Sequence, residues 1–373
     1  MKILVTGANG LIGWHAQARL HAANCAARFR GVPKPFEIVA LGHTEFDDDA
    51  TLWRALEGAV GVLHFAGVNR ASEEVVEAAN PAIAQRLAEA SRIIGAKPHV
   101  VYANSTHAVS DTPYGRSKRL AGEILGSAFE AYTDLTLPHI FGEGGHPFYN
   151  NVTATLIAQI LAGETPQVNP NGRVELLHAG DAAQRAIDAV EAGQAGVLAP
   201  EGRPISVPEL FEKLRGFHAD YGRNIFPDLS DEFDRRLFNS YRTATYPDGW
   251  PRPLTLNTDA RGALFEAVKG GGGGQTFLST TKPGITRGDH FHLHKVERFL
   301  VLQGEAVIRV RRVLSEDVWE YRVSGNAPAP VDMPPLHTHS IENVGSTDMI
   351  TLFWTSDLFD SRNPDTFADR VLP

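Results

Sequence analysis

Apolar and polar positions divide the chain into two differently patterned parts. In the first part, short aliphatic runs occur at residues 3–5, 36–41, 61–67 and 98–103 with little polar alternation. Such runs are typical of strands that are buried on both faces of a parallel sheet. Because stretches of helical character separate them, the pattern predicts an α/β fold.

The same part of the chain contains recognisable helix starts and further strands. The expected helices cover residues 14–22, residues 80–90, a segment from Pro113 with Thr112 as its cap, and a segment from Asp181. Residues 24–35 contain two prolines and are expected to form a loop-like insertion. Strand character returns at residues 135–142 and 167–177.

The second part of the chain has a different pattern of apolar and turn residues. Three prolines lie in residues 247–253, and five glycines follow at residues 270–274 as a flexible hairpin or loop. Strand-sized segments then alternate with turn residues at 276–280, 298–302, 306–312, 318–323 and 349–354. Because no long helix interrupts them, the pattern predicts an all-β sandwich or barrel. We therefore expect two domains, 1–250 and 251–373.

Composition narrows the possible partners. The chain has 373 residues and a net charge of −9, which argues against broad binding to nucleic acid or to an anionic membrane. Its one cysteine, Cys25, excludes an intramolecular disulfide framework and suits a reducing compartment. No apolar run approaches the length of a membrane span. Because the first strand begins at once, we expect no signal peptide and a cytoplasmic location.

A glycine-rich turn joins the first predicted strand to the first helix. It reads Gly7-x-x-Gly10-x-x-Gly13. One glycine allows the tight turn, one lets the backbone approach a pyrophosphate, and one lets the helix pack close to the strand. The phosphates then lie at the free N–H groups of the helix N-terminus. The alternative is a plain surface turn, which the β/α pattern that follows disfavours.

The second and third strands suggest which dinucleotide is bound. The second strand ends in Leu41-Gly42-His43-Thr44, with no acid to bind a free ribose 2′-OH. This end favours NADPH, and His43 is a candidate contact for its 2′-phosphate, although a solvated loop histidine is the alternative. Ala66 and Gly67 are small enough to let the nicotinamide-side ribose approach. Arg70 follows at the carboxyl edge of the sheet and is a candidate substrate contact.

A second motif supplies candidate catalytic groups. Tyr114 and Lys118 are four residues apart on the helix that begins at Pro113, so both face the same way. This arrangement suits reduction of a ketone. Tyr114 would protonate the developing alkoxide, Lys118 would lower the pKa of the tyrosine and hold the ribose, and Ser105 would bond the carbonyl oxygen. An ordinary amphipathic helix is the alternative.

These residues resemble the extended short-chain dehydrogenase/reductase family. The resemblance implies a Rossmann fold and often a nucleotide-sugar substrate. Ser105 is the best match to the family's serine, with Thr106 as the alternative. Asn151 and Arg173 are further candidate sugar-nucleotide contacts. The expected cofactor-binding residues are Gly7, Asn9, Gly10, Leu11, Ile12, Gly13, His43, Ala66, Gly67, Tyr114 and Lys118.

Histidines in the β-rich part form a candidate metal site. His290 and His292 are two residues apart and would point to one side of a strand, while Glu297 and His339 come from neighbouring segments. Imidazoles with one carboxylate suit Zn²⁺, Fe²⁺, Mn²⁺ or Ni²⁺, and Zn²⁺ is the expected metal. The spacing resembles both cupin motifs, except that Leu336 stands where the second motif usually has glycine. A metal-free cupin whose histidines act as bases is the alternative.

The order of a reductase followed by a cupin resembles the CapF-type capsular polysaccharide and O-antigen biosynthesis enzymes. Further matching stretches are residues 66–70, 281–290 and 326–343. The resemblance implies that the cupin epimerises C3 of a UDP-2-acetamido-2,6-dideoxy-4-hexulose. The reductase then reduces the C4 ketone with NADPH, giving a UDP-2-acetamido-2,6-dideoxy-L-talose on the route to UDP-N-acetyl-L-fucosamine. A homodimer is also expected.

The chemistry is consistent with that order. A 4-ketone acidifies the C–H bond at C3, so a base can remove the proton if the enolate is stabilised. Lys295 and His337 both remain candidates for the base. The expected substrate is a UDP-4-keto-6-deoxy-HexNAc. Two other readings stay open: a 4-keto-sugar reductase whose cupin only binds sugar or mediates dimerisation, and a non-catalytic NADP(H)-sensing regulator.

Overall fold

The computed structural model describes residues 1–260 and 262–372, and the chain forms two compact units. The first comprises Met1–Thr155 and Val168–Pro208, and the second comprises Leu156–Gln167 and Glu209–Pro373. Helices α6 (Val152–Leu161) and α8 (Val207–Gly222) contain the points where the chain passes from the first unit to the second. No helix among the described residues is long and apolar enough to cross a bilayer.

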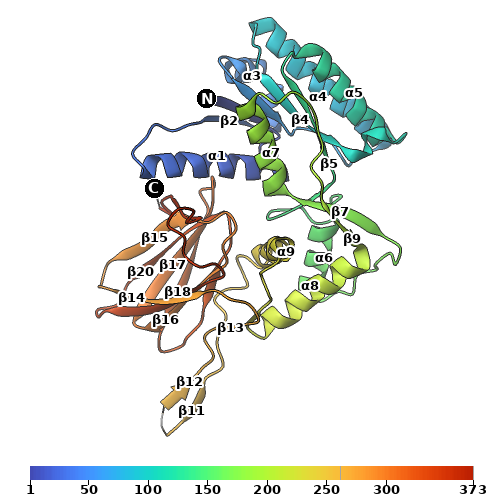
Figure 1. The fold of residues 1–373 in the computed structure, drawn as a ribbon. Helices are drawn as coiled ribbons and strands as arrows, with labels where there is room; N and C mark the ends of the chain where they lie inside the picture. Colours follow the sequence, from blue (N-terminus) through green and yellow to red (C-terminus); the bar gives the residue numbers. More distant parts are fainter. Residues whose placement is uncertain (261, 373) are drawn as a thin grey trace. The chain divides into compact units, whose positions relative to one another are not determined.

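A six-stranded parallel sheet forms the centre of the first unit (Figure 1). Its order is β2-β1-β3-β4-β5-β8. The strands are β1 (Lys2–Thr6), β2 (Glu37–Leu41), β3 (Gly61–His64), β4 (His99–Ser105), β5 (Tyr132–Leu137) and β8 (Gly196–Leu198). The order reverses direction at β1, between β2 and β3. In open α/β sheets, ligands bind at such a switch point, beyond the carboxyl ends of the strands.

Helices cover both faces of this sheet (Figure 1). Apolar residues of α1 (Leu11–Phe29) and α7 (Ala179–Ala192) pack on one face. Residues of α3 (Asp49–Leu56), α4 (Glu73–Ile94) and α5 (Pro113–Ala128) pack on the other. The short helix α2 (His43–Asp47) follows β2, and the turn η1 (Thr106–Val109) follows β4. A parallel sheet covered by helices on both faces is the predicted Rossmann arrangement.

Two predicted helix limits were wrong. Residues 24–29 belong to α1 rather than to a loop, because Asn24 is buried and exchanges hydrogen bonds of 2.9 and 3.1 Å with the backbone of Phe36. Asn80 does not open a helix but lies inside α4, which Ser72 caps. In both cases a contact made elsewhere in the fold outweighs the local turn signal.

The later strands of the first unit are shorter than predicted. Pro138 separates β5 from β6 (His139–Phe141), and the segment predicted at 167–177 is strand only in β7 (Arg173–His178). A small sheet of order β6-β7-β9 results, with β9 at Arg203–Ser206. His178 caps α7, so this helix begins at Ala179 rather than at Asp181.

The second unit is mostly antiparallel β structure, which is consistent with the predicted cupin. Its two main sheets have the orders β14-β21-β16-β19 and β18-β17-β20-β15-β22. The strands of the first sheet are β14 (Gln275–Thr281), β16 (Glu297–Gln303), β19 (Val331–Met333) and β21 (Met349–Thr355). Those of the second are β15 (Thr286–Phe291), β17 (Glu305–Arg312), β18 (Val318–Ser324), β20 (His337–Asn343) and β22 (Phe367–Ala368).

Short elements precede these sheets in the same unit. They are α9 (Glu232–Thr243), β10 (Ile225–Phe226), β11 (Asn257–Asp259), β12 (Gly262–Leu264) and β13 (Lys269–Gly270). Buried polar contacts join the helices to the β sheets: Tyr221 of α8 donates to Asp332 (2.6 Å), and Asn239 of α9 donates to the carbonyl of His294 (2.8 Å). These contacts explain why the compact units divide at Pro208 and Glu209, whereas the sequence suggested a junction near residue 250.

Candidate functional site

The glycine positions of the turn after β1 have no room for a side chain. Gly7 has a φ of +66°, and a Cβ atom there would lie 2.6 Å from the backbone nitrogen of Ala66. A Cβ atom on Gly13 would lie 2.2 Å from the carbonyl oxygen of Gly7. Gly10 stands at the N-cap of α1 and supplies no side-chain cap. The turn therefore leaves the start of α1 to an external anion, as a pyrophosphate site requires.

The loop after β3 is held by Asn80. Its amide oxygen accepts from the N–H of Val68, and its amide nitrogen donates to the carbonyl of Val68, both at 2.9 Å. The same nitrogen lies 2.9 Å from Oγ of Ser117 on α5. A Cβ atom on Gly67 would lie 2.8 Å from the Asn80 oxygen, so a small residue is needed there. Asn80 thus connects the Ala66–Val68 backbone to the helix that carries Tyr114 and Lys118.

Ser105 and Tyr114 come together at the carboxyl end of β4. Ser105 is buried, caps η1 through the N–H of His107 (3.1 Å) and forms a hydrogen bond that lowers the pKa of Tyr114. Burial of the tyrosine is the larger effect and raises its pKa above the ordinary value. The alternative partner, Thr106, is exposed. The structure therefore favours Ser105.

Lys118 is buried beside these residues. Its Nζ donates to the carbonyl of Ala103 and lies 4.1 Å from the ring centroid of Tyr102. Burial lowers the pKa of Lys118 to about 7, although the Asp134 carboxylate opposes that shift. We expected Lys118 to lower the pKa of Tyr114. In the protein without ligands, however, desolvation is the largest cause of the pKa shift of each group.

The end of β2 differs in detail from the sequence reading. His43 is 94% exposed, and its Nδ1 lies 3.5 Å from the Asp47 carboxylate. The amide of Asn9 and the carboxylate of Glu45 both lie against Gly42, 2.7 and 2.8 Å from where a Cβ atom would be. An acid is therefore close to the carboxyl end of β2, although the only acid within the strand is Glu37 at its start. The preference for NADPH stays a prediction.

The three candidate substrate residues have different environments. Arg70 and Arg173 are exposed, in the loop after β3 and at the start of β7. Asn151 is buried, and its side-chain oxygen accepts from the N–H of Ala154 (3.0 Å) at the start of α6. That contact caps the helix, so a direct sugar contact by Asn151 stays a prediction.

A buried polar cluster that the sequence reading did not single out lies behind the glycine turn. His15 of α1 contacts the carbonyl of Glu143 (2.9 Å), and Nε2 of His178 lies 2.8 Å from the Glu143 carboxylate. Nδ1 of His178 also accepts from the N–H of Gly180 (3.2 Å). This network ties the start of α1 to the start of α7, and the spacing of its members in sequence gave no signal for it.

The four predicted metal ligands converge in the second unit. Each of His290, His292, Glu297 and His339 offers a ligand atom, and these atoms lie within 4.8 Å of one another. One carboxylate oxygen of Glu297 lies 3.0 Å from Nε2 of His292 and 3.2 Å from Nε2 of His339. His290 of β15 pairs directly with His339 of β20, after a register shift that follows Gly288. The strand pairing therefore assembles the set.

Protonation and hydrogen bonding in this cluster fit a divalent cation. Burial lowers the pKa of His290 to about 3 and also lowers that of His339, so both imidazoles are neutral at pH 7. Burial alone would raise the pKa of Glu297, but His292 and His339 hold it well below the ordinary value. Nε2 of His339 is buried and lies 3.2 Å from the Glu297 carboxylate, but among the described residues it makes no hydrogen bond of good geometry. Neutral imidazoles, one carboxylate and an unsatisfied nitrogen are what a cation would complete.

Leu336 takes the turn where a glycine was expected. Its φ is +58°, a left-handed conformation, and its N–H donates to the carbonyl of His292 (2.7 Å). The geometry of the turn is therefore kept without glycine. The two candidate bases lie nearby in the chain. His337 is buried with its ring 5.7 Å from that of Trp319, and Nζ of Lys295 donates to the carbonyl of Pro364 (2.7 Å).

Two family models match the two parts of the chain. Residues 3–199 match the NAD dependent epimerase/dehydratase family, and residues 257–367 match the polysaccharide biosynthesis C-terminal domain. A UDP-2-acetamido-2,6-beta-L-arabino-hexul-4-ose reductase of Pseudomonas aeruginosa is 30% identical over 380 residues, covering 100% of this chain and 99% of the relative. The chain belongs to the NAD dependent epimerase/dehydratase family.

Solved structures refine this assignment within the family. The capsular polysaccharide assembling protein CapF of Staphylococcus aureus matches over 100% of both chains, with 30% identity and a TM-score of 0.57. A structure of CapF with the inhibitor 3-isopropenyl-tropolone also matches over both full chains, with 29% identity and a TM-score of 0.54. The chain is thus a CapF-type capsular polysaccharide enzyme, as its motifs predicted, and its reductase part is that of an NAD(P)-dependent sugar reductase.

Proposed function

We propose that this CapF-type enzyme acts twice on one UDP-2-acetamido-2,6-dideoxy-4-hexulose, first inverting C3 in the cupin and then reducing C4 in the Rossmann unit. The observation that carries the proposal is the presence of two complete residue sets in one chain. One is Ser105 with Tyr114 and Lys118, and the other is the histidine and glutamate cluster around Glu297. The name of the Pseudomonas relative, a reductase of a 4-keto UDP-sugar, supports the substrate class.

The first step is proton transfer at C3. A base in the cupin removes the C3 proton, the electron pair moves into the C4 carbonyl as an enolate, and a proton returns to C3 from the opposite face. A divalent metal, which we propose to be Zn²⁺, supplies positive charge that stabilises the enolate when it is bound by His290, His292, Glu297 and His339. Lys295 and His337 both remain candidates for the base, because each has a polar partner that would hold its side chain in place.

The second step is reduction at C4. NADPH supplies the hydride, and Tyr114 donates its phenolic proton to the oxygen that becomes the C4 hydroxyl. Ser105 holds that oxygen next to the phenol, and a charged Lys118 stabilises the phenolate left behind. The product is a UDP-2-acetamido-2,6-dideoxy-L-talose, on the route to UDP-N-acetyl-L-fucosamine for capsule or O-antigen.

Incubation with a UDP-4-keto-6-deoxy-HexNAc in D₂O, with and without NADPH, tests both steps. Without NADPH we expect deuterium to enter C3, and with NADPH we expect the ketone to disappear as the cofactor is oxidised. NMR of the sugar and absorbance of the cofactor read the two events separately. Oxidation without exchange would instead support a reductase whose cupin only binds sugar or mediates dimerisation. Cofactor binding with neither reaction would support a non-catalytic sensor.

We also propose that the enzyme works in the cytoplasm as a homodimer. NADPH and UDP-sugars are cytoplasmic metabolites. Strand β14 is the outer strand of its sheet, and it exposes Phe277 (40%) and Leu278 (63%). An apolar outer strand is a surface on which a second copy can pack. Light scattering of the purified chain tests this state, and a monomer at micromolar concentration would contradict it.

A further inference from the structure

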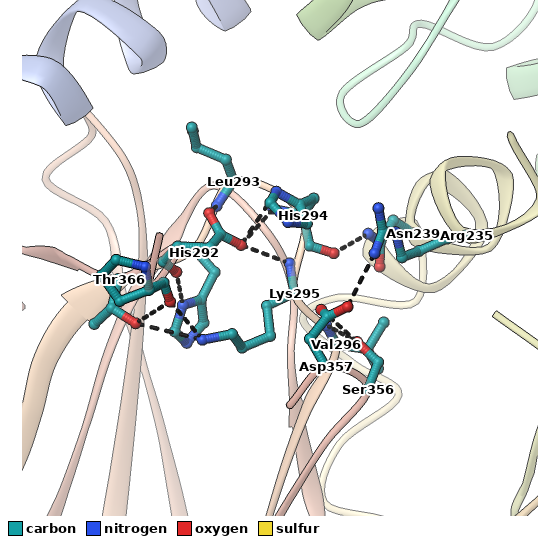
Figure 2. A network of polar contacts seen from close by, with 12 residues as sticks. Arg235, Asn239, His292, Leu293, His294, Lys295, Val296, Ser356, Asp357 and Thr366 are labelled. Atoms are coloured by element: carbon teal, nitrogen blue, oxygen red, sulfur yellow. Dashed lines mark hydrogen bonds and ion pairs between the residues drawn. The ribbon is translucent and has the colours of Figure 1, made fainter. Parts of the chain in front are cut away.

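A short segment near the C-terminus caps the loop that follows the metal ligand His292. The backbone N–H groups of Leu293, His294 and Lys295 donate to the carboxylate of Asp365, at 2.9, 3.2 and 2.9 Å. Figure 2 shows these three loop residues beside the ligand candidate His292. Asp365 is 6% exposed and has a φ of +41°. Non-glycine residues rarely adopt this left-handed conformation, and it persists only where surrounding contacts hold the residue in it.

The same residue also orients the ligand itself. The backbone carbonyl of Asp365 accepts a hydrogen bond from Nδ1 of His292. With its proton on Nδ1, the imidazole has its other nitrogen free as a ligand, and Nε2 lies 3.0 Å from the Glu297 carboxylate. Outer contacts of this kind set the tautomer and the ring direction of metal-binding histidines.

Other contacts fix the loop in place (Figure 2). Lys295 donates through Nζ to the carbonyl of Pro364 at 2.7 Å, and the N–H of Val296 donates to Oγ of Ser356 at 3.2 Å. Asn239 of α9 donates to the carbonyl of His294 at 2.8 Å. The loop is therefore anchored by several elements, and only Asp365 contacts both the loop backbone and the His292 ring among these anchors.

We infer that Asp365 is a positioning residue for the cupin metal site, through its carboxylate on the 293–295 backbone and its carbonyl on His292. This inference rests on the metal-holding role proposed above. Removing the carboxylate releases three backbone N–H groups and frees the Asp365 backbone from its left-handed conformation. The carbonyl then no longer holds the His292 ring, and the metal site loses the preset direction of one ligand.

The test is Zn²⁺ binding to the full-length apoprotein, measured by competition with a chromophoric chelator. We expect Asp365→Ala to weaken Zn²⁺ binding by about 10- to 100-fold, the range typical of outer contacts to metal ligands. Asp365→Asn keeps a residue that tolerates the left-handed backbone and should show a loss in the same direction. Asp360→Ala is the matched control, because the Asp360 carboxylate accepts from Arg362 within its own segment (2.9 Å). It should bind Zn²⁺ like the wild type.

Two further readouts separate the possible outcomes. The visible spectrum of the Co²⁺-loaded protein should change in both Asp365 variants, since ligand direction alters it, and NADPH oxidation should continue and show that the chain is folded. If the wild type binds Zn²⁺ and both folded Asp365 variants bind it equally well, the positioning role is refuted while the metal site stands. If the wild type itself binds no divalent metal, both the proposed metal site and this inference fail.

Discussion

At the scale of single residues, burial decides the chemistry of the reductase site. Tyr114 is largely shielded from solvent and Lys118 is buried, so the charged form of each is disfavoured: the pKa of the phenol rises and that of the ammonium falls to about 7. The pair is therefore close to a neutral state before any ligand binds. An anionic cofactor and a carbonyl substrate would restore the charge that catalysis needs.

Reduction should depend on pH through Lys118. Because its pKa is about 7 rather than 10.5, the ammonium form is lost as pH rises through 7. If the charged form is required, kcat/KM for NADPH should fall above pH 7 by up to about tenfold per pH unit, since this ratio reports groups of the free enzyme. Steady-state rates between about pH 5 and 9, roughly two units on either side of 7, measure the profile. Lys118→Arg should move the fall to higher pH, and an unchanged profile in that variant would argue against Lys118.

Tyr114→Phe removes only the phenolic proton donor. NADPH oxidation should fall by about 10²- to 10⁴-fold, the usual contribution of a general acid. Deuterium exchange at C3 should continue, because the cupin cluster does not include Tyr114. Both are measured on one sample with the 4-keto UDP-sugar in D₂O. Loss of both activities together would contradict separate sites.

At the scale of elements, strand register and turn conformation assemble the candidate metal cluster. His290 and His339 face each other because β15 and β20 pair with a register shift after Gly288. Leu336 enters β20 from a left-handed conformation and donates its N–H to the carbonyl of His292. The turn thus connects the two cupin motifs. Where a glycine would have no side chain, Leu336 has one that is buried.

The substitution Leu336→Gly should have two opposing effects on the stability of the second unit. Glycine would relieve a left-handed strain of about 1–2 kcal/mol, but removing a buried leucine side chain costs about 3–5 kcal/mol. Because Leu336 is only 2% exposed, the cost of the lost burial should exceed the gain from relieved strain. The second unit should therefore be destabilised by about 2 kcal/mol. Urea unfolding followed by tryptophan fluorescence measures the change.

Leu314→Gly is the control for this substitution. Leu314 has a φ of +66° but is 48% exposed, so glycine relieves strain there with little lost burial. We expect this variant to be as stable as the wild type or slightly more stable. If Leu336→Gly were also stabilising, strain rather than packing would dominate at the cupin turn.

At the scale of the whole molecule, two chemically different sites share one chain. The candidate hydride site lies at the carboxyl ends of β1 and β4 in a parallel sheet, and the candidate metal cluster lies among antiparallel strands. Each unit has its own buried groups, and no residue serves both sets. In the proposed reaction the ketone connects the two steps, since it acidifies C3 in the first and accepts the hydride in the second.

A mixture of two variants, each lacking one of the two proposed activities, tests this division. Tyr114→Phe should invert C3 without reducing C4, and His290→Ala should reduce C4 without inverting C3. Mixed in equal amounts with substrate and NADPH, they should yield the sugar that is both inverted and reduced, which NMR identifies. Failure of the mixture, with each variant retaining its own activity, would show that the intermediate does not pass through solution between molecules.

Much of the fold, and the residues that come together at both candidate sites, were predictable from the sequence because the signals are local. The glycine spacing at 7, 10 and 13, the helical spacing of Tyr114 and Lys118, and the alternating strands after residue 270 each express a backbone geometry that neighbouring residues determine. The family assignment rests on the same motifs.

Other features depended on contacts between distant residues and could not be predicted. Asn24 extends α1 because it bonds to Phe36, and Asn80 lies inside α4 because the Val68 backbone meets it there. The acid near β2 comes from Glu45, in the helix that follows the strand.

The sequence by itself determined which chemical groups this enzyme carries and on which elements they stand, since element type follows from local pattern and spacing. Only the tertiary structure decided how those groups behave. The pKa of Lys118 depends on how completely the fold excludes water around it. The direction of His292 depends on Asp365, more than seventy residues further along the chain. Burial and long-range hydrogen bonds exist only once the chain has folded, so no local pattern encodes them.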